Sequence, residues 1–145
     1  MYGPIFMEDN MEKNEKISVN MNIGTLSQID ILVDNGFYSN RSDFINQAVR
    51  EALKDKQYNI QQEMDKYDKM NFIWFMGICR LDADELMKIK NNGNKKVIKG
   101  HGLLYIDEYL DDLVIETISK INVKGKVLCS DKLKEFYNLN NKDNA

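Results

Sequence analysis

Hydrogen-bonding side chains recur at every second position near the start of the chain. The polar positions are Lys16, Ser18 and Asn20, and the apolar positions between and after them are Ile17, Val19 and Met21. This alternation predicts a half-buried strand, because successive side chains of a strand point to opposite faces. The polar face offers an ammonium, a hydroxyl and an amide, all hydrogen-bonding groups without a paired nucleophile and base. The pattern therefore favours recognition over catalysis.

The predicted strand lacks a pairing partner within its own neighbourhood. A single strand of about six residues cannot satisfy its own backbone donors and acceptors. The simplest partner is the same segment of a second copy, paired antiparallel about a two-fold axis, since a symmetric contact needs only one self-complementary surface. We therefore expect a homodimer joined by a two-stranded ribbon.

Two amphipathic helices are predicted directly after the strand. Asn22 is placed to cap the first helix, and Gly36 stands where a left-handed residue ends it. The second helix begins near Ser39 or Asn40, with Asp43 in its first turn. Helices this short bury too little apolar surface alone, so dimerisation is expected to cover them. The expected dimer core consists of Ile17, Val19, Met21, Leu26, Ile29, Phe44, Ile45, Ala48 and Val49.

The run ISVNMNIGTLSQIDILVDNGFYSNRSDFINQAVREAL resembles the ribbon-helix-helix repressors of the CopG, Arc and MetJ type. Its strand-to-turn length, the Gly36 turn, the helix start over residues 38–43 and the apolar order Phe44, Ile45, Ala48 match the family's arrangement. In such proteins the ribbon of the dimer lies in the DNA major groove, which is wide enough to admit it.

The resemblance implies roles for two groups of residues. Outward strand side chains would read bases, and the backbone amides at the start of the second helix would hold a phosphate. Lysine can donate to guanine, and asparagine can pair with adenine through two hydrogen bonds. The implied base-reading residues are Lys16, Ser18 and Asn20, and the implied phosphate-binding residues are Ser39, Asn40 and Arg41. The alternative role of Arg41 is a surface ion pair with Asp43 or Glu51.

Two positions depart from the family's pattern. Asn20 stands where the family often has arginine, which alters the expected target sequence. Asn22, Ile23 and Gly24 replace a Pro-Glu helix start, and a glycine there weakens the helix by about 1 kcal/mol relative to alanine. The fold is expected to tolerate both changes.

Charge and composition limit the possible partners. The 145-residue chain has a net charge of −3, and residues 16–56 hold five basic and five acidic side chains. Phosphate neutralisation supplies most non-specific DNA affinity, so this module is expected to bind random DNA poorly. No apolar run approaches the roughly 20 residues of a membrane helix, and the N-terminus is too acidic for a signal peptide, so a cytoplasmic protein without membrane contact is expected.

A weak repeat follows the helices. Segments 77–82, 102–107 and 125–130 each begin with glycine, carry apolar residues and end at a helix cap. Helices are predicted over 83–91, 108–119 and 131–138, the first stopped by Gly93. One strand and one helix per unit predicts parallel strands covered by helices, either solenoid-like or as a compact βαβαβα sandwich.

The predicted fold is therefore α+β, with five parts along the chain. They are a flexible arm over 1–14, a ribbon-helix-helix domain over 15–56, a helical connector over 57–71, an α/β repeat domain over 72–139 and a disordered tail over 140–145. Cys79 and Cys129 are interpreted as small buried apolar residues, and His101 has no neighbouring ligand. No catalytic residue, metal or cofactor is predicted.

The functional hypothesis is a cytoplasmic, homodimeric, sequence-specific DNA-binding regulator, acting as a repressor on an operator in double-stranded DNA. The repeat domain would mediate oligomerisation beyond the dimer, contact with a protein, or sensing of an effector. One alternative is an antitoxin that represses its own promoter while its C-terminal part masks a toxin. The other is a scaffold protein whose ribbon only dimerises. The sequence offers no constellation for an enzyme.

Overall fold

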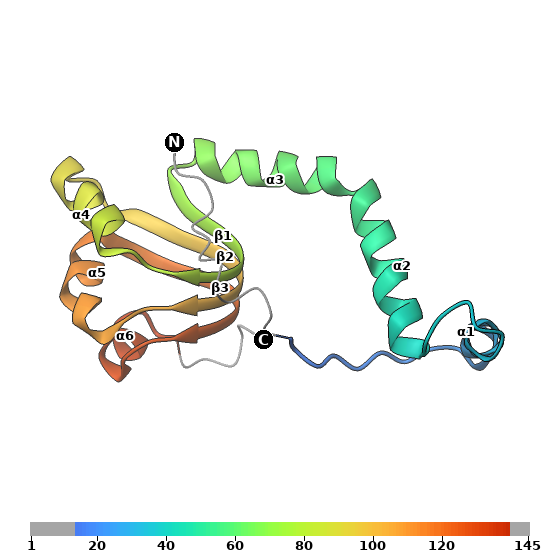
Figure 1. Ribbon diagram of the computed structural model, residues 1–145. Coiled ribbons are helices and arrows are strands. Elements are labelled where there is room, and N and C mark those ends of the chain that lie inside the picture. Colours follow the sequence, from blue (N-terminus) through green and yellow to red (C-terminus); the bar gives the residue numbers. More distant parts are fainter. Residues whose placement is uncertain (1–13, 140–145) are drawn as a thin grey trace. The chain divides into compact units, whose positions relative to one another are not determined.

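The computed structural model describes residues 14–139, which form two compact units, residues 14–63 and residues 64–139 (Figure 1). The predicted N-terminal arm, apart from Asn14, and the predicted tail over 140–145 lie outside the described residues. No helix within 14–139 is long and apolar enough to cross a membrane.

The first unit is built from helices. Helix α1 spans Ile23–Asp34, α2 spans Arg41–Asp55, and α3, Gln57–Lys69, begins in this unit. The Asn22 side chain caps α1 by accepting a hydrogen bond from the Gly24 amide at 2.7 Å. Gly36 adopts a left-handed φ of 78°, and the Phe37 amide then donates to the Leu32 carbonyl at 2.9 Å. Both predicted ends of the first helix are therefore confirmed.

The segment before α1 forms no regular structure in a single chain. Residues 14–22 are neither helical nor part of a strand, and all of them are exposed. The predicted strand over 16–21 would need a second copy to complete its backbone hydrogen bonds. The ribbon-helix-helix arrangement is therefore not confirmed by this structure and stays a prediction.

The second unit contains a three-stranded parallel sheet. Its strands are β1 (Phe72–Arg80), β2 (Lys96–Tyr105) and β3 (Ile118–Leu128), in the order β1-β2-β3. The connections contain α4 (Ala83–Asn92), the 3-10 helix η2 (Glu108–Leu110) and α5 (Asp111–Thr117), and α6 (Asp131–Phe136) follows β3. Helices α4, α5 and α6 lie on one face of the sheet (Figure 1). Sequential parallel strands with helical connections agree with the predicted βα repeat.

The hydrophobic core lies between the sheet and these three helices. Strand residues of one parity enter it, and the buried helix residues meet them. Its most buried members include Phe75, Cys79, Leu86, Ile98, Leu104, Val114, Ile118, Val123 and Leu133. Burial raises the pKa of the Cys79 thiol to about 12, as expected for an inert core cysteine. Cys129 is only partly buried, and burial also raises its pKa.

The glycines of the predicted repeat form a row across the sheet. Gly77 pairs with Gly102, and Gly102 pairs with Gly125, with φ angles of 91°, 128° and 140°. A Cβ atom on Gly102 would collide with the carbonyl oxygen of Gly77, and one on Gly125 would collide with that of Gly102. The repeat therefore has a physical cause, because only glycine permits this conformation and this close approach.

The predicted boundaries of the strands and helices in the repeat are partly wrong. Each strand begins before its glycine, at Phe72, Lys96 and Ile118, whereas the prediction began each strand at the glycine itself. The helix predicted over 108–119 is shorter, because α5 ends at Thr117 and β3 starts at the next residue. Packing against the sheet places Ile118, Ile121 and Val123 in the core, and tertiary contacts of this kind override local helix patterns.

Candidate nucleic-acid interface

The three predicted base-reading residues are accessible. Lys16, Ser18 and Asn20 are all exposed in the segment before α1. The apolar residues between them are exposed as well, Ile17 by 79% and Val19 by 69%. Exposed branched apolar residues in a regular alternation are unfavourable in water unless another surface covers them. This segment therefore has a polar side fit for hydrogen bonding and an apolar side without a partner in the single chain.

The start of α2 is fixed by reciprocal hydrogen bonds. The Asn40 side chain accepts from the Asp43 amide at 2.8 Å, and the Asp43 carboxylate accepts from the Ser39 amide at 3.0 Å. Gln47 donates to the other Asp43 oxygen at 2.9 Å. The Ser39 amide, followed by the Gln47 side chain, holds the pKa of Asp43 below its ordinary value. This arrangement resembles a capping box, except that the Asp43 carboxylate accepts from the residue before the N-cap, and it fixes the direction in which α2 leaves the turn.

Backbone amides at this helix start remain available to an anion. Within residues 14–139, the N–H groups of Asn40, Arg41 and Ser42 have no hydrogen-bond acceptor. They are among the first amides of a 15-residue helix, where the helix dipole also favours negative charge. The amide of Ser39 is different, because it already donates a hydrogen bond to the Asp43 carboxylate. The phosphate-binding role predicted for Ser39, Asn40 and Arg41 stays a prediction; in the described residues the free amides of this helix start belong to Asn40, Arg41 and Ser42.

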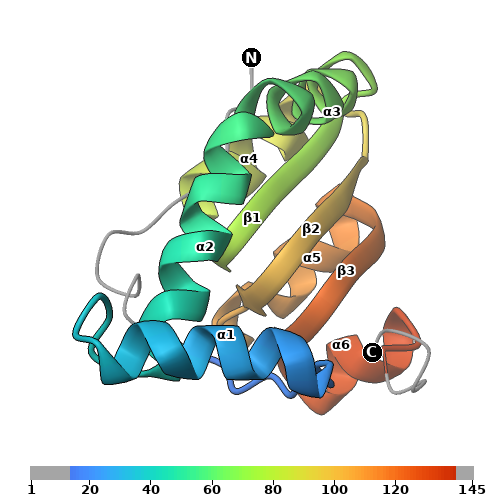
Figure 2. The same ribbon diagram turned by 90° about the vertical axis from the view of Figure 1, so that its right-hand side faces the viewer.

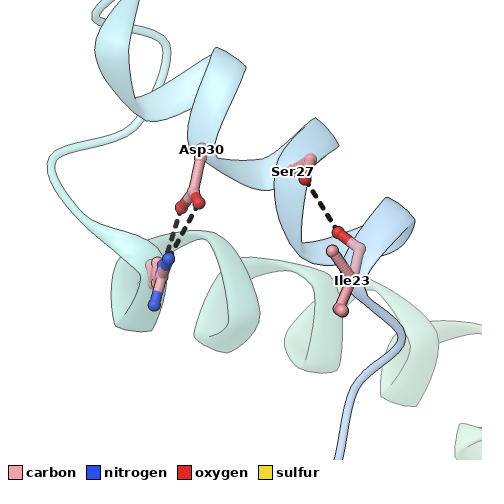
Figure 3. A network of polar contacts seen from close by, with 4 residues as sticks. Ile23, Ser27 and Asp30 are labelled. Carbon is pink, nitrogen blue, oxygen red and sulfur yellow. Dashed lines mark hydrogen bonds and ion pairs between the residues drawn. The ribbon is translucent and has the colours of Figure 1, made fainter.

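The Arg41 side chain joins the two helices. Its Nε and one terminal nitrogen donate to the two carboxylate oxygens of Asp30 at 2.7 and 2.8 Å (Figure 3). This pairing lowers the pKa of Asp30. The predicted ion-pair alternative for Arg41 named the wrong acids, because the partner lies on α1 and is neither Asp43 nor Glu51. Sequence reasoning missed Asp30, since a partner eleven residues away leaves no local pattern. In the same view, Ser27 donates to the Ile23 carbonyl at 2.8 Å.

The predicted dimer core is mostly uncovered in one chain. Ile29 is buried, at 3% exposure, while Leu26 and Phe44 are partly buried. The Phe44 ring packs edge-on against Tyr38, with 4.9 Å between ring centroids. Ala48 is exposed, Ile45 and Val49 keep 38% and 49% of their surface exposed, and α2 contains no buried residue. The structure thus brings Ile29 into a core and leaves the other predicted members wholly or partly accessible.

Among residues 14–139, no group of three or more His, Cys, Asp or Glu side chains is placed to hold a metal ion. The available groups are hydrogen-bond donors and acceptors on an exposed segment, and free amides at a helix start. Such groups suit the recognition of a polyanion that also presents hydrogen-bonding groups on its bases.

Comparison with known proteins assigns the chain to a family. A sequence model of the ribbon-helix-helix transcriptional regulator family matches residues 12–134, which include both compact units as far as α6. Neither the curated proteins nor the solved structures contain a significant match to the chain. Because the match extends over most of the sequence, the chain belongs to the ribbon-helix-helix transcriptional regulator family.

Proposed function

We propose that this protein is a sequence-specific DNA-binding repressor that acts in the cytoplasm as a homodimer. Residues 16–21 of two copies pair antiparallel, and the resulting ribbon enters the major groove of the operator. Lys16, Ser18 and Asn20 contact base edges. The amides at the start of α2 hold a backbone phosphate on each side. Repression follows because the bound dimer occupies the promoter in place of polymerase.

The observation that carries the proposal is the exposed apolar alternation of residues 16–21. Val19 exposes 69% of its surface, and the apolar side of α2 is also uncovered. Ribbon pairing would bury both at once and satisfy the unpaired backbone groups of the segment. The same pairing would turn the polar side chains toward the solvent side of the ribbon, which is the side a groove would meet.

The start of α2 supports the contact to the DNA backbone. The N–H groups of Asn40, Arg41 and Ser42 are free within the described residues, and no side chain has to move to expose them. A phosphate held there would be bound by hydrogen bonds and by the helix dipole. Such a contact fixes the position of the ribbon in the groove without reading sequence itself.

The ordered C-terminal unit favours a regulator over an antitoxin. Residues 64–139 form a sheet with a continuous core, in which Phe75, Ile98 and Val123 are almost completely buried. A toxin-masking tail of the kind that folds on its target would lack a core of its own. Limited proteolysis of the full chain distinguishes the two, since this unit should resist digestion.

Selection of bound sequences from random duplex DNA tests the proposal. The wild-type chain should enrich a short, nearly palindromic or tandem motif. Asn20→Ala should lose preference at one position by about 1–3 kcal/mol, because one bidentate contact to a base is removed. Arg50→Ala serves as the control and should leave the preferred sequence unchanged. If wild-type protein enriches no motif at low salt, the protein is not a sequence-specific regulator of this kind.

A further inference from the structure

We define the open face of the sheet as the side of β1, β2 and β3 that points away from α4, α5 and α6. This face differs in charge from the helices. The three strands contain no aspartate or glutamate. Helices α4, η2, α5 and α6 together hold eight acidic and four basic side chains. Apart from Asp65 and Asp68 of α3 and the loop residues Asp82 and Asp107, the acids of the second unit lie in the helical layer. Figure 2 shows the sheet from the open side, with α4 and α5 behind the strands.

Strand β3 provides the basic charge of the open face. Val97 and Lys120 pair across the sheet, as do His101 and Lys124, and Leu103 and Lys126. Since the core residues Ile121 and Val123 have the opposite parity, these three lysines point to the open face. All three are exposed, and within residues 14–139 none of them forms an ion pair.

The opposite edge of the open face is already covered near the start of β1. Trp74 is 5% exposed, and its indole N–H donates to the Asp68 carboxylate of α3 at 2.5 Å. The ammonium of Lys99 lies 4.7 Å from the centre of the Tyr67 ring. The buried tryptophan is thus not available to stack on an unpaired base, whereas Lys120, Lys124 and Lys126 remain exposed. This favours contacts with a phosphate backbone over single-stranded nucleic acid.

The geometry of the lysines suits a polyphosphate strand. Lys120 and Lys126 are six residues apart, which in a strand spans about 20 Å. One strand of duplex DNA presents a phosphate about every 3.4 Å along its axis, so the three ammonium groups are far enough apart to contact different phosphates. The first unit cannot supply this charge, because residues 14–63 hold five basic and seven acidic side chains.

We propose that Lys120, Lys124 and Lys126 bind the phosphate backbone of duplex DNA. This inference rests on the proposed function and extends it: the ribbon reads the sequence, and the open face adds affinity that does not depend on sequence. The two surfaces have different roles because their charges differ. The acidic first unit gains little affinity from counterion release, whereas a separate basic surface can supply this affinity.

The test measures how DNA affinity depends on salt for the full-length chain. Binding to a labelled random-sequence duplex is followed by fluorescence anisotropy over a range of KCl concentrations. The test variant replaces three strand residues, Lys120→Gln, Lys124→Gln and Lys126→Gln. The control removes the same charge from the helical layer, with Lys88→Gln, Lys132→Gln and Lys134→Gln. Circular dichroism and thermal unfolding establish that both variants are folded, and Lys124→Gln alone replaces the test variant if it is not.

The strand variant should lower the slope of log K against log salt by about 0.9 for each phosphate that it no longer neutralises, and the control should keep the wild-type slope. An equal decrease in both variants would mean that only net charge matters, and the inference would be wrong. An unchanged slope together with a changed sedimentation mass would assign the open face to self-association and also overturn it.

The outcomes separate this inference from the proposed function. If sequence selection still enriches a motif while the strand variant keeps its salt slope, the open face does not bind DNA and the repressor proposal stands. If no motif is enriched but the slope falls, the chain binds DNA through the open face without reading sequence.

Discussion

Arg41, the first residue of α2, donates two parallel hydrogen bonds to Asp30 of α1 at 2.7 and 2.8 Å. The pair connects the two helices at the point where α2 offers free amides to an anion. It also neutralises the guanidinium that lies beside those amides. Asp30 therefore limits the positive charge of the proposed phosphate site while it holds the helix start in place.

Removing Asp30 should strengthen DNA binding. Asp30→Asn frees the Arg41 guanidinium for a phosphate, so affinity for duplex DNA at low salt should rise about two- to fivefold. Fluorescence anisotropy measures the change. Asp34→Asn removes the same charge from an exposed, unpaired position on the same helix and should have a smaller effect. Equal gains from both variants would show that Arg41 is not involved.

The stabilisation that the Asp30–Arg41 pair provides should decrease as the pH falls into the acid range. The pairing lowers the pKa of Asp30 from its ordinary 3.8, so the folded state binds its proton less readily than the unfolded state does. Its contribution is complete above the ordinary pKa and is lost as pH falls through the lowered value. The difference in melting temperature between wild type and Asp30→Asn should therefore shrink between about pH 5 and about pH 2. A constant difference across this range would contradict the assignment.

A charge in the predicted ribbon should separate the dimer while the second unit stays folded. Val19 is 69% exposed in a single copy, so Val19→Lys removes no contact there, whereas two lysines would face each other across a ribbon. Sedimentation equilibrium should show a shift toward the single-chain mass of 16.9 kDa and loss of DNA binding. Ile31→Lys, on α1 and 60% exposed, is the matched control. A dimer that survives Val19→Lys would exclude ribbon pairing.

The glycine row should respond unequally to the same substitution. Gly77 and Gly102 both have positive φ, but only Gly102 faces a carbonyl oxygen that a Cβ atom would strike. Gly77→Ala should cost about 1–3 kcal/mol through backbone strain alone. Gly102→Ala should cost more, because the β1–β2 pairing must also move. Chemical unfolding monitored by circular dichroism compares the two variants, and equal losses would show that the close approach is unimportant.

The single tryptophan reports how the end of α3 packs on the sheet. Trp74 donates its indole hydrogen to Asp68, and both side chains are at least partly buried. Asp68→Ala should destabilise the second unit by about 1–3 kcal/mol, because the indole loses a charged acceptor. It should also shift the tryptophan emission to longer wavelength. Asp68→Asn keeps an acceptor oxygen and should preserve most of the emission spectrum; the same red shift in both variants would indicate that the helix end, rather than this bond, is disturbed.

Local sequence patterns were sufficient to predict α1, α2 and the glycine repeat. Asn22, Asn40 and Gly36 act within a few residues of themselves, so their types predict where the helices begin and end. The alternation of residues 16–21 likewise predicts a strand, but the partner that we propose for it is a second copy, and a single chain leaves it without a strand's hydrogen bonds.

Tertiary structure decided what depends on residues distant in sequence. It paired Arg41 with Asp30, started each strand of the sheet before its glycine, and placed three lysines of β3 on one face of a sheet whose strands contain no acidic residue. Ion pairs, strand register and surface charge arise from contacts between separate elements. The energies of these contacts cannot be predicted from a short segment of sequence. The sequence determined the first two helices and their ends, and folding determined where the strands begin and which side chains share a surface.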